Sequence, residues 1–387
     1  MPYLFDKEAL SKYLQEHNLP SYRYKQIMQA IFRDQQIDIE EMTTLPKELK
    51  TQLEADFGLN TFTTEMISDS DETTKFLFKL PDGNVIETVL MYHRHEKETT
   101  TDTRKILRSR TDHKISDETH TLNRITICVS TQVGCAVGCI FCVTGKLGFK
   151  KNLSREEIVL QLLVGNQFIK EKFGKKADGT RNRIRNVVFM GMGEPLLNYE
   201  NMKTSIEYML DQDALGLSKR HITISTSWVA SYIDKLVQDG IDVRLALSLH
   251  APNQELRQKL IPMIAKKRPI DDLMQSVDAY EAATGNRIFY EYIIIKGMTD
   301  TAEIAHQLGK LLQVRNAHVN LIPYNENPAM PDLITSEFDT ILAFKKIVET
   351  YGVTVTVRDT LGRNVKGACG QLGYEKLMKE RIEEMQE

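Results

Sequence analysis

The chain has 387 residues, with 50 lysines and arginines against 53 aspartates and glutamates, so its formal net charge is −3. This balance excludes a protein that is basic all over, and any contact with nucleic acid has to come from local patches of charge. No apolar run is long enough to span a bilayer, and residues 1–8 lack the basic and apolar regions of a signal peptide, so we expect a cytoplasmic protein with no membrane partner. The length predicts a large core with smaller attachments.

The first 60 residues predict a small helical unit. Apolar residues recur at three- and four-residue spacing over Lys7–His17, Tyr24–Arg33 and Pro46–Phe57, as in helices that pack along one face. No pattern of catalytic residues accompanies them. We therefore expect residues 1–60 to form an accessory domain of three helices.

A β-hairpin and a long polar stretch follow. Two apolar segments flank the pair Asp82-Gly83, which is typical of a tight hairpin turn. Glu87 lies within the second segment among apolar neighbours, and the pattern alone favours the solvent face for its carboxylate. The stretch from about residue 93 to 123 is polar and has no periodicity, which predicts an exposed loop or insertion. We expect residues 61–123 to form this hairpin and linker.

From residue 124 the pattern changes to strands that alternate with helices, which predicts an α/β fold with a parallel sheet. Six β/α units in series are typical of a barrel or an open part of one, with its working site at the carboxyl ends of the strands. We expect this partial (β/α)6 barrel over residues 124–366, one more strand at Val353–Arg358, and a loop and charged tail helix over residues 367–387. The predicted strands are Arg124–Ser130, Asn186–Met190, His221–Thr226, Val243–Leu249, Arg287–Ile295 and His318–Ile322. The predicted helices are Arg155–Phe173, Met202–Asp211, Ser231–Gln238, Ile270–Ala283, Thr301–Gln313 and Phe338–Tyr351.

Cys135, Cys139 and Cys142 follow the first predicted barrel strand at the spacing Cys-x3-Cys-x2-Cys, and we call residues 135–142 the cysteine loop. Thiolates at this spacing can bind three irons of a four-iron, four-sulfur (4Fe-4S) cluster and leave the fourth iron open to another ligand. The alternative is a structural zinc site, but such sites are normally closed by paired arms, and no cysteine or histidine follows at the required spacing. The sequence therefore predicts an iron–sulfur centre in a reducing compartment.

Polar residues recur at the carboxyl ends of the other predicted barrel strands. Gly193 and Glu194 end the second strand, where glycine allows a ligand to approach the backbone and the carboxylate can hold an amine, although a tight turn also explains the glycine. Their common edge favours a shared pocket, although His250 taken alone is more often a core histidine. The other strand-end residues are Ser225, Ser248, Leu249, His250 and Asn325.

Cys369 lies between small residues, in the segment Gly367-Ala368-Cys369-Gly370. This setting is typical of an exposed, reactive thiol, and a buried unreactive cysteine is the alternative.

The cysteine loop, with Phe141 just before its last cysteine, resembles that of the radical S-adenosylmethionine (SAM) superfamily. There SAM binds the open iron of a 4Fe-4S cluster and is cleaved to a 5′-deoxyadenosyl radical. With Cys369 included, the chain resembles over nearly all its length the RlmN and Cfr family of radical SAM enzymes, which methylate adenine rings in RNA. The segments that carry this likeness are Cys135–Gly148, Gly191–Asn198, Leu217–Thr226, Ser248–Pro252, Asn320–Asn325 and Ala368–Leu372.

The resemblance implies a role for every cysteine. One SAM methylates Cys369, and a radical from a second SAM takes hydrogen from the S-methyl group, so that the carbon radical adds to adenine. Cys128 then releases the product by forming a disulfide with Cys369, and Glu87 accepts a proton. The implied SAM contacts are Gly193, Glu194, Ser225, Ser248, Leu249, His250 and Asn325, and the implied cluster ligands are Cys135, Cys139 and Cys142.

The resemblance also implies partners. Pro195 is similar to the branch of the family that methylates adenine C2, whereas the C8 branch tends to have alanine there. The expected substrates are 23S ribosomal RNA near the peptidyl-transferase centre and transfer RNA beside the anticodon, with a one-electron reductant such as flavodoxin or ferredoxin. The resemblance further implies that the helical domain of residues 1–60 helps to bind RNA. We expect a monomer.

Alternatives remain at this stage: a C8 methyltransferase that gives antibiotic resistance, a radical SAM enzyme with another substrate, or a non-enzymatic zinc module that binds RNA. Two features depart from the family pattern, namely the long polar stretch over residues 93–123 and Trp228, where glycine is usual. Several short basic clusters, among them Lys175–Arg185, permit RNA binding, and solvated surface is the alternative for each.

Overall fold

The computed structural model describes residues 1–59, 61–70, 72–94, 122–176, 179–227, 230–266, 269–358 and 367–373. Most of the polar stretch between residues 93 and 123, Trp228 and the expected tail helix lie outside the described residues. Among the helices that are described, none combines the length and the apolar character that crossing a membrane requires.

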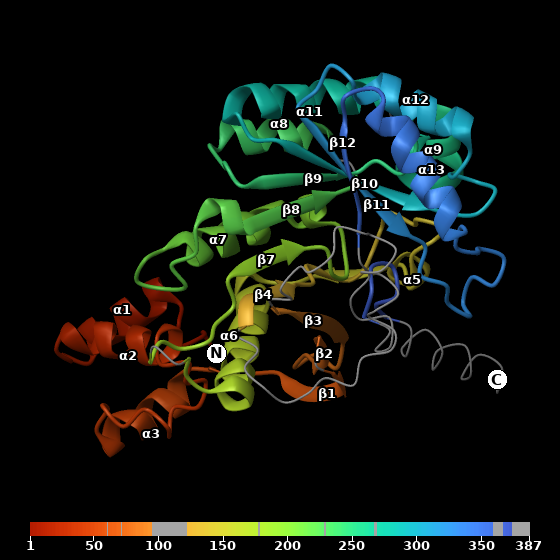
Figure 1. Cartoon of the computed structure of the whole chain (residues 1–387). Helices are drawn as coiled ribbons and strands as arrows, with labels where there is room; N and C mark the ends of the chain where they lie inside the picture. The colour runs from red at the N-terminus through yellow and green to blue at the C-terminus, as the bar shows by residue number, and fades with distance from the viewer. Residues whose placement is uncertain are drawn as a thin grey trace.

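One sheet of ten strands organises the described part of the chain, in the order β1-β2-β3-β4-β7-β8-β9-β10-β11-β12. Every neighbouring pair from β4 to β12 is parallel, as the alternation of strands and helices predicts. The two end strands do not pair within the described residues, so the α/β fold is an open, partial barrel (Figure 1). The strands are β1 (Thr63–Asp69), β2 (Thr73–Lys79), β3 (Val85–Arg94), β4 (Leu122–Cys128), β7 (Asn186–Phe189), β8 (Ile222–Thr226), β9 (Arg244–Ser248), β10 (Ile288–Ile294), β11 (Ala317–Pro323) and β12 (Thr354–Val357).

Helices cover the outer side of the barrel, and the three N-terminal helices pack beside it (Figure 1). Each predicted helix that falls within the described residues is confirmed to within three residues at either end, and α6 begins and ends where the sequence places it. Its start is fixed by a capping box, in which Ser154 and Glu157 satisfy each other's backbone N–H groups. The helices are α1 (Lys7–Glu16), α2 (Tyr22–Phe32), α3 (Lys47–Asp56), α5 (Val143–Lys146), α6 (Arg155–Phe173), α7 (Tyr199–Leu210), α8 (Ala230–Gln238), α9 (Gln254–Leu260), α10 (Pro262–Ala265), α11 (Ile270–Thr284), α12 (Ala302–Leu312) and α13 (Phe338–Glu349).

The predicted hairpin of β2 and β3 is part of the barrel sheet, because β3 also pairs antiparallel with β4. β1, which the sequence analysis did not predict, extends this antiparallel part. A separate ribbon of β5 (Gln132–Gly134) and β6 (Phe149–Asn152) frames the cysteine loop.

The register decides which side chains face the inside of the barrel. Cys128 opposes Val89 on one side and Val188 on the other, and alternate residues along each strand share this inner face. The main hydrophobic core runs without interruption from the N-terminal helices to β12. The N-terminal unit therefore packs on the barrel through a common core.

Candidate active site

Cys135, Cys139 and Cys142 lie beyond the carboxyl end of β4, on the loop that joins β5 to α5. Glycine is required beside it, because a Cβ on Gly134, whose φ is +74°, would lie 1.7 Å from the carbonyl oxygen of Gly148. The loop packs against a second hydrophobic cluster, distinct from the main core. Its buried apolar residues outside the cysteines are Val137, Phe141, Ala251, Leu256, Leu260, Ile261, Ile293, Ile295 and Tyr324.

Cys135 is buried and Cys139 and Cys142 are half-buried beside it, and this setting suits the three thiols to a metal cluster. Burial raises the pKa of Cys135 to about 12 and that of Cys142 above its ordinary value. Burial raises the pKa of Cys139 still more, and repulsion from the other two cysteines adds to it. Thiolates in this setting need the positive charge of a metal.

The spacing of the three cysteines is the feature that suits a 4Fe-4S cluster. In the described part of the chain, no three His, Cys, Asp or Glu side chains converge closely enough to hold one metal ion. A 4Fe-4S cluster binds each thiolate at a different iron, so its ligands stand apart, whereas a zinc site needs ligands that meet at one point. The zinc alternative therefore gains no support from the geometry.

Gly193 and Glu194 follow β7 at the same edge of the sheet. A side chain does not fit at Gly193, because its φ is +101° and a Cβ there would lie 2.5 Å from the Cβ of Gln132. The carboxylate of Glu194 is 3% exposed and accepts hydrogen bonds from the N–H and the hydroxyl of Ser227, at 2.9 and 2.8 Å. Burial nevertheless raises the pKa of Glu194. The chain thus fixes one buried carboxylate beside the cysteine loop.

Ser225 and Ser248 end β8 and β9, and their hydroxyl oxygens lie 3.4 Å apart. The side chain of Leu249 is fully buried in the main core, while its backbone N–H donates to the carbonyl of Glu291 at 3.1 Å. Any contact between Leu249 and a ligand would therefore involve its backbone.

His250 is a buried residue with a positive φ of 57°. Its Nδ1 accepts a hydrogen bond from the N–H of Ile293 at 3.1 Å, and its ring packs edge-on against Phe141 of the cysteine loop, with 4.9 Å between centroids. Burial, with a smaller effect of Arg257, lowers the pKa of His250 to about 3. The imidazole is therefore neutral and supports the loop through Phe141.

Arg257, on α9, is a buried cation that the sequence analysis missed. Its guanidinium is 2% exposed and donates to the carbonyl of Ser248 at 3.1 Å and to the carbonyls of Leu249 and Ser227. Burial lowers the pKa of Arg257 to about 10, so the group stays charged at neutral pH near Cys139. The sequence signal that could have identified Arg257 is that it shares a helix face with Leu260, because the buried face of a helix is otherwise apolar.

Residues 367–373, which we call the Cys369 loop, lie directly on the cysteine loop and α5. The carbonyl of Gly370 accepts from the N–H of Val143 at 2.8 Å, and the carbonyl of Leu372 accepts from the hydroxyl of Thr144 at 2.8 Å. Cys369 itself is an exposed free thiol, which confirms the exposed setting that its neighbours predict. Two segments more than 220 residues apart in sequence thus meet at one edge of the barrel.

Asn325 also contacts the Cys369 loop, since its side-chain amide donates to the carbonyl of Cys369 at 3.1 Å. Asn320, from the same sequence motif, lies on β11 and donates to the carboxylate of Glu291 at 2.9 Å. Of the two asparagines, Asn325 is the one beside the candidate thiol.

Cys128 ends β4, and its thiol is buried. Burial raises the pKa of Cys128 to about 12; the nearby Cys369 raises it further, and Arg358 acts in the opposite direction. Arg358 forms an ion pair with Glu291 at 3.3 Å. Burial alone would lower the pKa of Arg358, but Glu291 and the two thiols raise it above its ordinary value. Cys128, Arg358 and the exposed Cys369 therefore lie near enough to influence one another electrostatically.

The prediction that Glu87 faces solvent is wrong. Its carboxylate is 2% exposed and forms an ion pair at 3.2 Å with Lys75, which is fully buried. Val89 opposes both Lys75 and Cys128, so these two residues and Glu87 share the inner face, where diagonal neighbours lie roughly 7–8 Å apart. The alternating pattern gave the wrong prediction because β3 lies within the sheet, between β2 and β4, and both of its faces are covered. This position is compatible with the role that the family resemblance implies.

Comparisons with known proteins agree with this arrangement. Residues 129–308 match the family model of the radical SAM superfamily, and residues 4–58 match the model described as "Ribosomal RNA large subunit methyltransferase N-terminal domain". A crystal structure of a radical SAM methyltransferase from Sphaerobacter thermophilus has a TM-score of 0.83 and 34% identity, over 96% of this chain and 99% of that one.

Curated relatives match over almost the whole chain. A Dictyoglomus thermophilum protein named "Probable dual-specificity RNA methyltransferase RlmN" is 39% identical over 95% of each chain. A Nitrosopumilus maritimus protein named "Ribosomal RNA large subunit methyltransferase N" is 37% identical over 94% of this chain and 96% of its own length. With this likeness and the arrangement of its cysteines, the chain belongs to the RlmN family of radical SAM RNA methyltransferases.

Proposed function

We propose that this enzyme methylates C2 of specific adenines in RNA, with Cys369 as the carrier of the methyl group. The observation that carries the proposal is the docking of the Cys369 loop on the cysteine loop, through the hydrogen bonds of Val143 and Thr144. A free thiol beside the three cysteines of the cysteine loop joins the two requirements of the chemistry, a carrier and a radical source. The relatives named for ribosomal RNA and for dual specificity support 23S ribosomal RNA and transfer RNA as substrates.

When bound, a 4Fe-4S cluster and SAM would supply a 5′-deoxyadenosyl radical that can take hydrogen from a methyl group. The chain offers Cys135, Cys139 and Cys142 to hold the cluster. Gly193, whose lack of a side chain opens the backbone, and the buried carboxylate of Glu194 suit the amino acid part of SAM. Ser225, Ser248, Leu249, His250 and Asn325 complete the proposed SAM site at this edge.

The remaining steps use groups on the inner face. The sulfur of Cys369 takes a methyl group from SAM by displacement, and after hydrogen is removed this carbon bonds to the adenine ring. Glu87 accepts the proton from the ring carbon, and the unpaired electron of the adduct would return to the oxidised cluster. The thiolate of Cys128 then attacks the sulfur of Cys369, so that a disulfide forms and the bond between sulfur and the transferred carbon breaks with its electron pair on the carbon. A proton returned by Glu87 completes the methyl group, and the methylated adenine is released.

The disulfide must be reduced before the next turnover, and a one-electron donor such as flavodoxin or ferredoxin would serve the cluster. We place the enzyme in the cytoplasm, where both proposed RNA substrates are found, and propose that it acts as a monomer. Each proposal follows from the chemistry and the RNA substrates of the relatives.

The proposal is tested with anaerobically reconstituted protein and an RNA hairpin that contains the target adenine. We expect C369A to cleave SAM but to produce no methylated adenine, because the carrier sulfur is gone. Mass spectrometry of RNA digests distinguishes 2-methyladenosine from 8-methyladenosine. Methylation by C369A would contradict the carrier role, and the C8 product would favour the alternative branch of the family.

The proposed role of Cys128 predicts a product of its own, a covalent adduct between the protein and RNA. Without Cys128 the bond between Cys369 and the RNA cannot be resolved, so C128A should carry covalently attached RNA. Denaturing gel electrophoresis before and after ribonuclease treatment detects this adduct. A double variant C128A/C369A is the matched control, since it lacks the sulfur to which RNA attaches, and equal amounts of adduct in both proteins would refute the assignment.

A further inference from the structure

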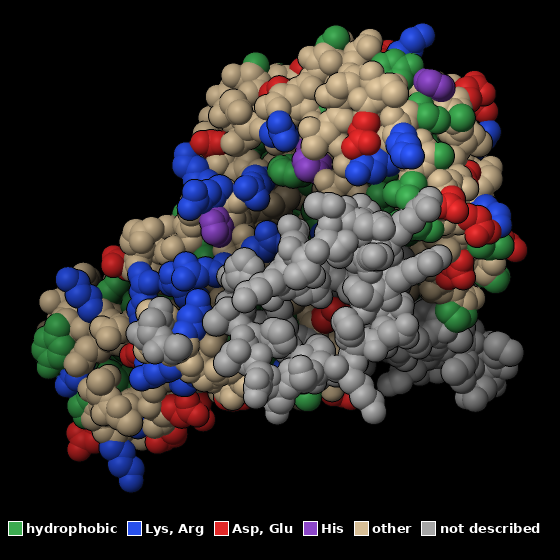
Figure 2. Space-filling model, viewed as in Figure 1, with side chains coloured by type: hydrophobic (Ala, Val, Ile, Leu, Met, Phe, Trp, Pro, Cys, Tyr) green, Lys and Arg blue, Asp and Glu red, His purple; other side chains and the backbone are tan. Residues whose placement is uncertain are grey.

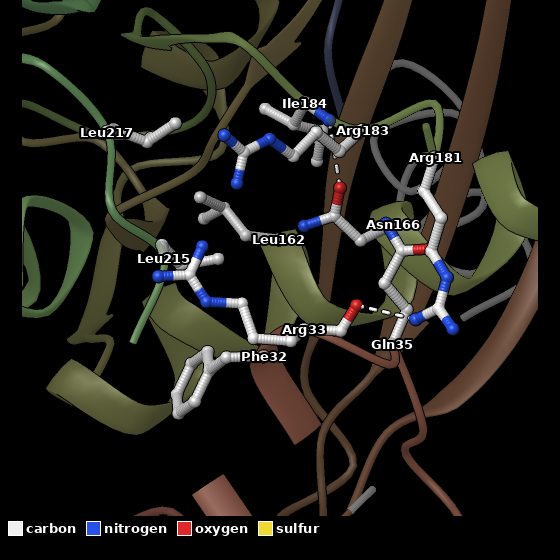
Figure 3. Close-up of a pocket in the computed structure, with 10 residues that line it drawn as sticks. All are labelled: Phe32, Arg33, Gln35, Leu162, Asn166, Arg181, Arg183, Ile184, Leu215 and Leu217. Atoms are coloured by element: carbon white, nitrogen blue, oxygen red, sulfur yellow. Dashed lines mark hydrogen bonds between the residues drawn. The ribbon is translucent and has the colours of Figure 1, made fainter. Parts of the chain in front are cut away.

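A pocket far from the cysteine loop lies at the amino ends of the barrel strands, where the N-terminal helices meet the barrel (Figure 3). Its walls come from the end of α2, from α6, and from the segments before β7 and β8. It has a volume of about 410 Å³ including its open mouth. Three arginines line it: Arg33, Arg181 and Arg183. Nothing in the proposed methylation chemistry uses them.

Arg183 is the residue of the pocket whose charge most requires an anionic ligand. It is partly buried, and it makes no hydrogen bond or ion pair with any residue that the structure describes. Burial lowers the pKa of Arg183, and two other cations, Arg185 and Arg33, lower it further. A partly desolvated guanidinium among like charges is costly unless an anion accompanies it.

The two other arginines are held in place by the chain itself. Arg33 donates to the backbone carbonyl of Gln212. Arg181 donates to the carbonyl of Arg33 at 2.7 Å and pairs with Asp34 at 2.8 Å. Because Asp34 neutralises Arg181, the positive charge that remains in the pocket comes from Arg33 and Arg183. Arg33 is held in position by its bond to Gln212 before any ligand arrives, which lowers the entropic cost of binding, whereas Arg183 has no partner among the described residues.

Asn166 adds a neutral donor between them. Its side-chain oxygen accepts from the N–H of Ile184 at 2.9 Å, which turns the amide nitrogen away from Ile184. Figure 3 shows this nitrogen directed into the pocket, on the side where the guanidinium groups of Arg33 and Arg183 lie. The amide nitrogen makes no hydrogen bond within the described residues. Three hydrogen-bond donors thus surround one space, as binding of a tetrahedral phosphate group requires.

The basic surface continues from the pocket toward the inside of the barrel. Arg185 follows Arg183, and its carbonyl bonds to the ring of His221 at 3.0 Å, beside Arg220. Further along the same edge, Arg124 has its pKa lowered by burial and by Arg244 on the inner face. Figure 2 shows lysine and arginine side chains gathered between the N-terminal helices and the barrel. A chain of phosphates could follow this surface, whereas a single small anion would need only the pocket.

We propose that the pocket of Arg33, Arg183 and Asn166 binds a backbone phosphate of the RNA substrate and so anchors the RNA at the edge of the barrel opposite the cysteine loop. The occupant is RNA because the cations extend beyond the pocket as a surface suited to a polyanion. This inference rests on the proposed function only in taking RNA as the substrate. It assigns the N-terminal unit a specific task, because Arg33 belongs to that unit and Arg183 to the barrel.

Direct binding of a fluorescent RNA hairpin to the full chain tests the proposal, without SAM or reductant. We expect R183Q and R33Q each to weaken affinity roughly three- to tenfold at low salt. Each should also make the slope of log affinity against log salt shallower by about 0.7–0.9, since one phosphate contact is lost. K310Q removes one exposed charge from the outer helix α12 and is the matched control, with affinity and slope unchanged. Equal slopes for R183Q and the unmodified chain would overturn the proposal.

Asn166→Asp separates binding from folding. The aspartate keeps an oxygen for the N–H of Ile184 but places a negative charge beside Arg33 and Arg183, so thermal stability should be maintained or raised. RNA affinity should nevertheless fall further than in R183Q, because the carboxylate occupies the guanidinium groups and repels phosphate. If the arginines only clamp the N-terminal helices, N166D would bind RNA as well as the unmodified chain, and the proposal would be wrong.

Two further measurements distinguish RNA binding at this pocket from binding of free phosphate and from an effect on the chemical step. Inorganic phosphate, added at constant ionic strength, should displace RNA only weakly. Phosphate binding that R183Q abolishes, with RNA affinity unchanged, would identify a free-phosphate pocket and overturn the RNA proposal. In methylation assays R183Q should raise KM for RNA and leave kcat unchanged. Because binding is measured without catalysis, failure of the methylation chemistry would leave this result intact, and the reverse also holds.

Discussion

At the scale of single residues, the site depends on places where only one side chain fits. Gly193 is the clearest case, because a Cβ there would lie 2.5 Å from the Cβ of Gln132 and 2.8 Å from its backbone nitrogen. Backbone atoms cannot move away from the added Cβ as the end of a flexible side chain can. The loop would have to move, and Glu194 would move with it.

We therefore predict that Gly193→Ala weakens SAM binding at least tenfold and lowers the midpoint of thermal unfolding, from strain of about 1–3 kcal/mol together with the clash. Equilibrium dialysis with labelled SAM and a thermal melt measure the two effects. Gly240→Ala is the matched control, since Gly240 also has a positive φ of 66° but has nothing within 4 Å of the added Cβ. Unchanged SAM binding by G193A would show that the loop has room to adjust.

The ion pair of Lys75 and Glu87 makes a second prediction at this scale. Removing only the cation by Lys75→Met leaves a carboxylate buried without its partner, which costs about 3–5 kcal/mol of unfolding free energy. The double variant K75M/E87L removes both charges and should recover most of that loss. Urea unfolding followed by circular dichroism compares them. Lys259→Met, in an exposed helical pair with Glu255, should change stability little. A K75M protein as stable as the parent would show that Glu87 is protonated or solvated.

At the scale of elements, the contact of α5 with the Cys369 loop determines where the thiol of Cys369, the proposed carrier, lies. The hydroxyl of Thr144 bonds to the carbonyl of Leu372, and both groups are buried. We predict that Thr144→Val, which keeps the shape and removes the donor, loosens this loop by about 1–3 kcal/mol and slows methylation while iron content stays normal.

Hydrogen exchange of the peptide that contains residues 367–373 reports the loosening directly. Thr204→Val is the control, because its hydroxyl bonds only within its own helix, to the carbonyl of Glu200. If exchange in the Cys369 loop is the same in T144V and T204V, the hydrogen bond does not hold the loop.

The sequence predicted the parallel strands and the long helices well and the antiparallel strands incompletely. Apolar periodicity found α6 and every parallel strand, because tertiary packing and local preference agree there. It missed β1 and the ribbon of β5 and β6, whose strands are stabilised by their partners. It also placed Glu87 on the solvent face, since an alternating pattern does not reveal that a strand is covered on both sides. Arg257 was missed for a related reason, because its partners are backbone carbonyls that come from distant segments.

The candidate site was predictable to the extent that it uses residue types with special chemistry. The cysteines and their spacing indicated a metal cluster, and the strand ends indicated where a ligand would lie. That Asn325 contacts the Cys369 loop while Asn320 bonds to Glu291 depends on where β11 ends, which spacing alone does not determine.

At the scale of the whole molecule, the cysteine loop, which is the proposed cluster site, packs apart from the main core. The cysteine loop packs on its own hydrophobic cluster, while the main core joins the N-terminal helices to the barrel. We predict that anaerobic removal of iron with a chelator leaves the far-ultraviolet circular dichroism nearly unchanged and lowers the thermal midpoint only modestly. Small metal domains, in contrast, unfold when their metal is removed. Extensive loss of helical signal on chelation would mean that the second cluster holds the barrel together.

The antiparallel pairing of β3 with β4 has a consequence for changes in the length of the chain between the two strands. The two strands end together at Arg94 and Leu122, seven residues along β3 from Glu87, or roughly 23 Å. Their register is set by the pairs between them, and each doubling of the length of a connecting loop costs only about 0.6 kcal/mol. The pairing of β3 with β4 therefore uncouples the position of Glu87 from the length of the chain that joins the two strands.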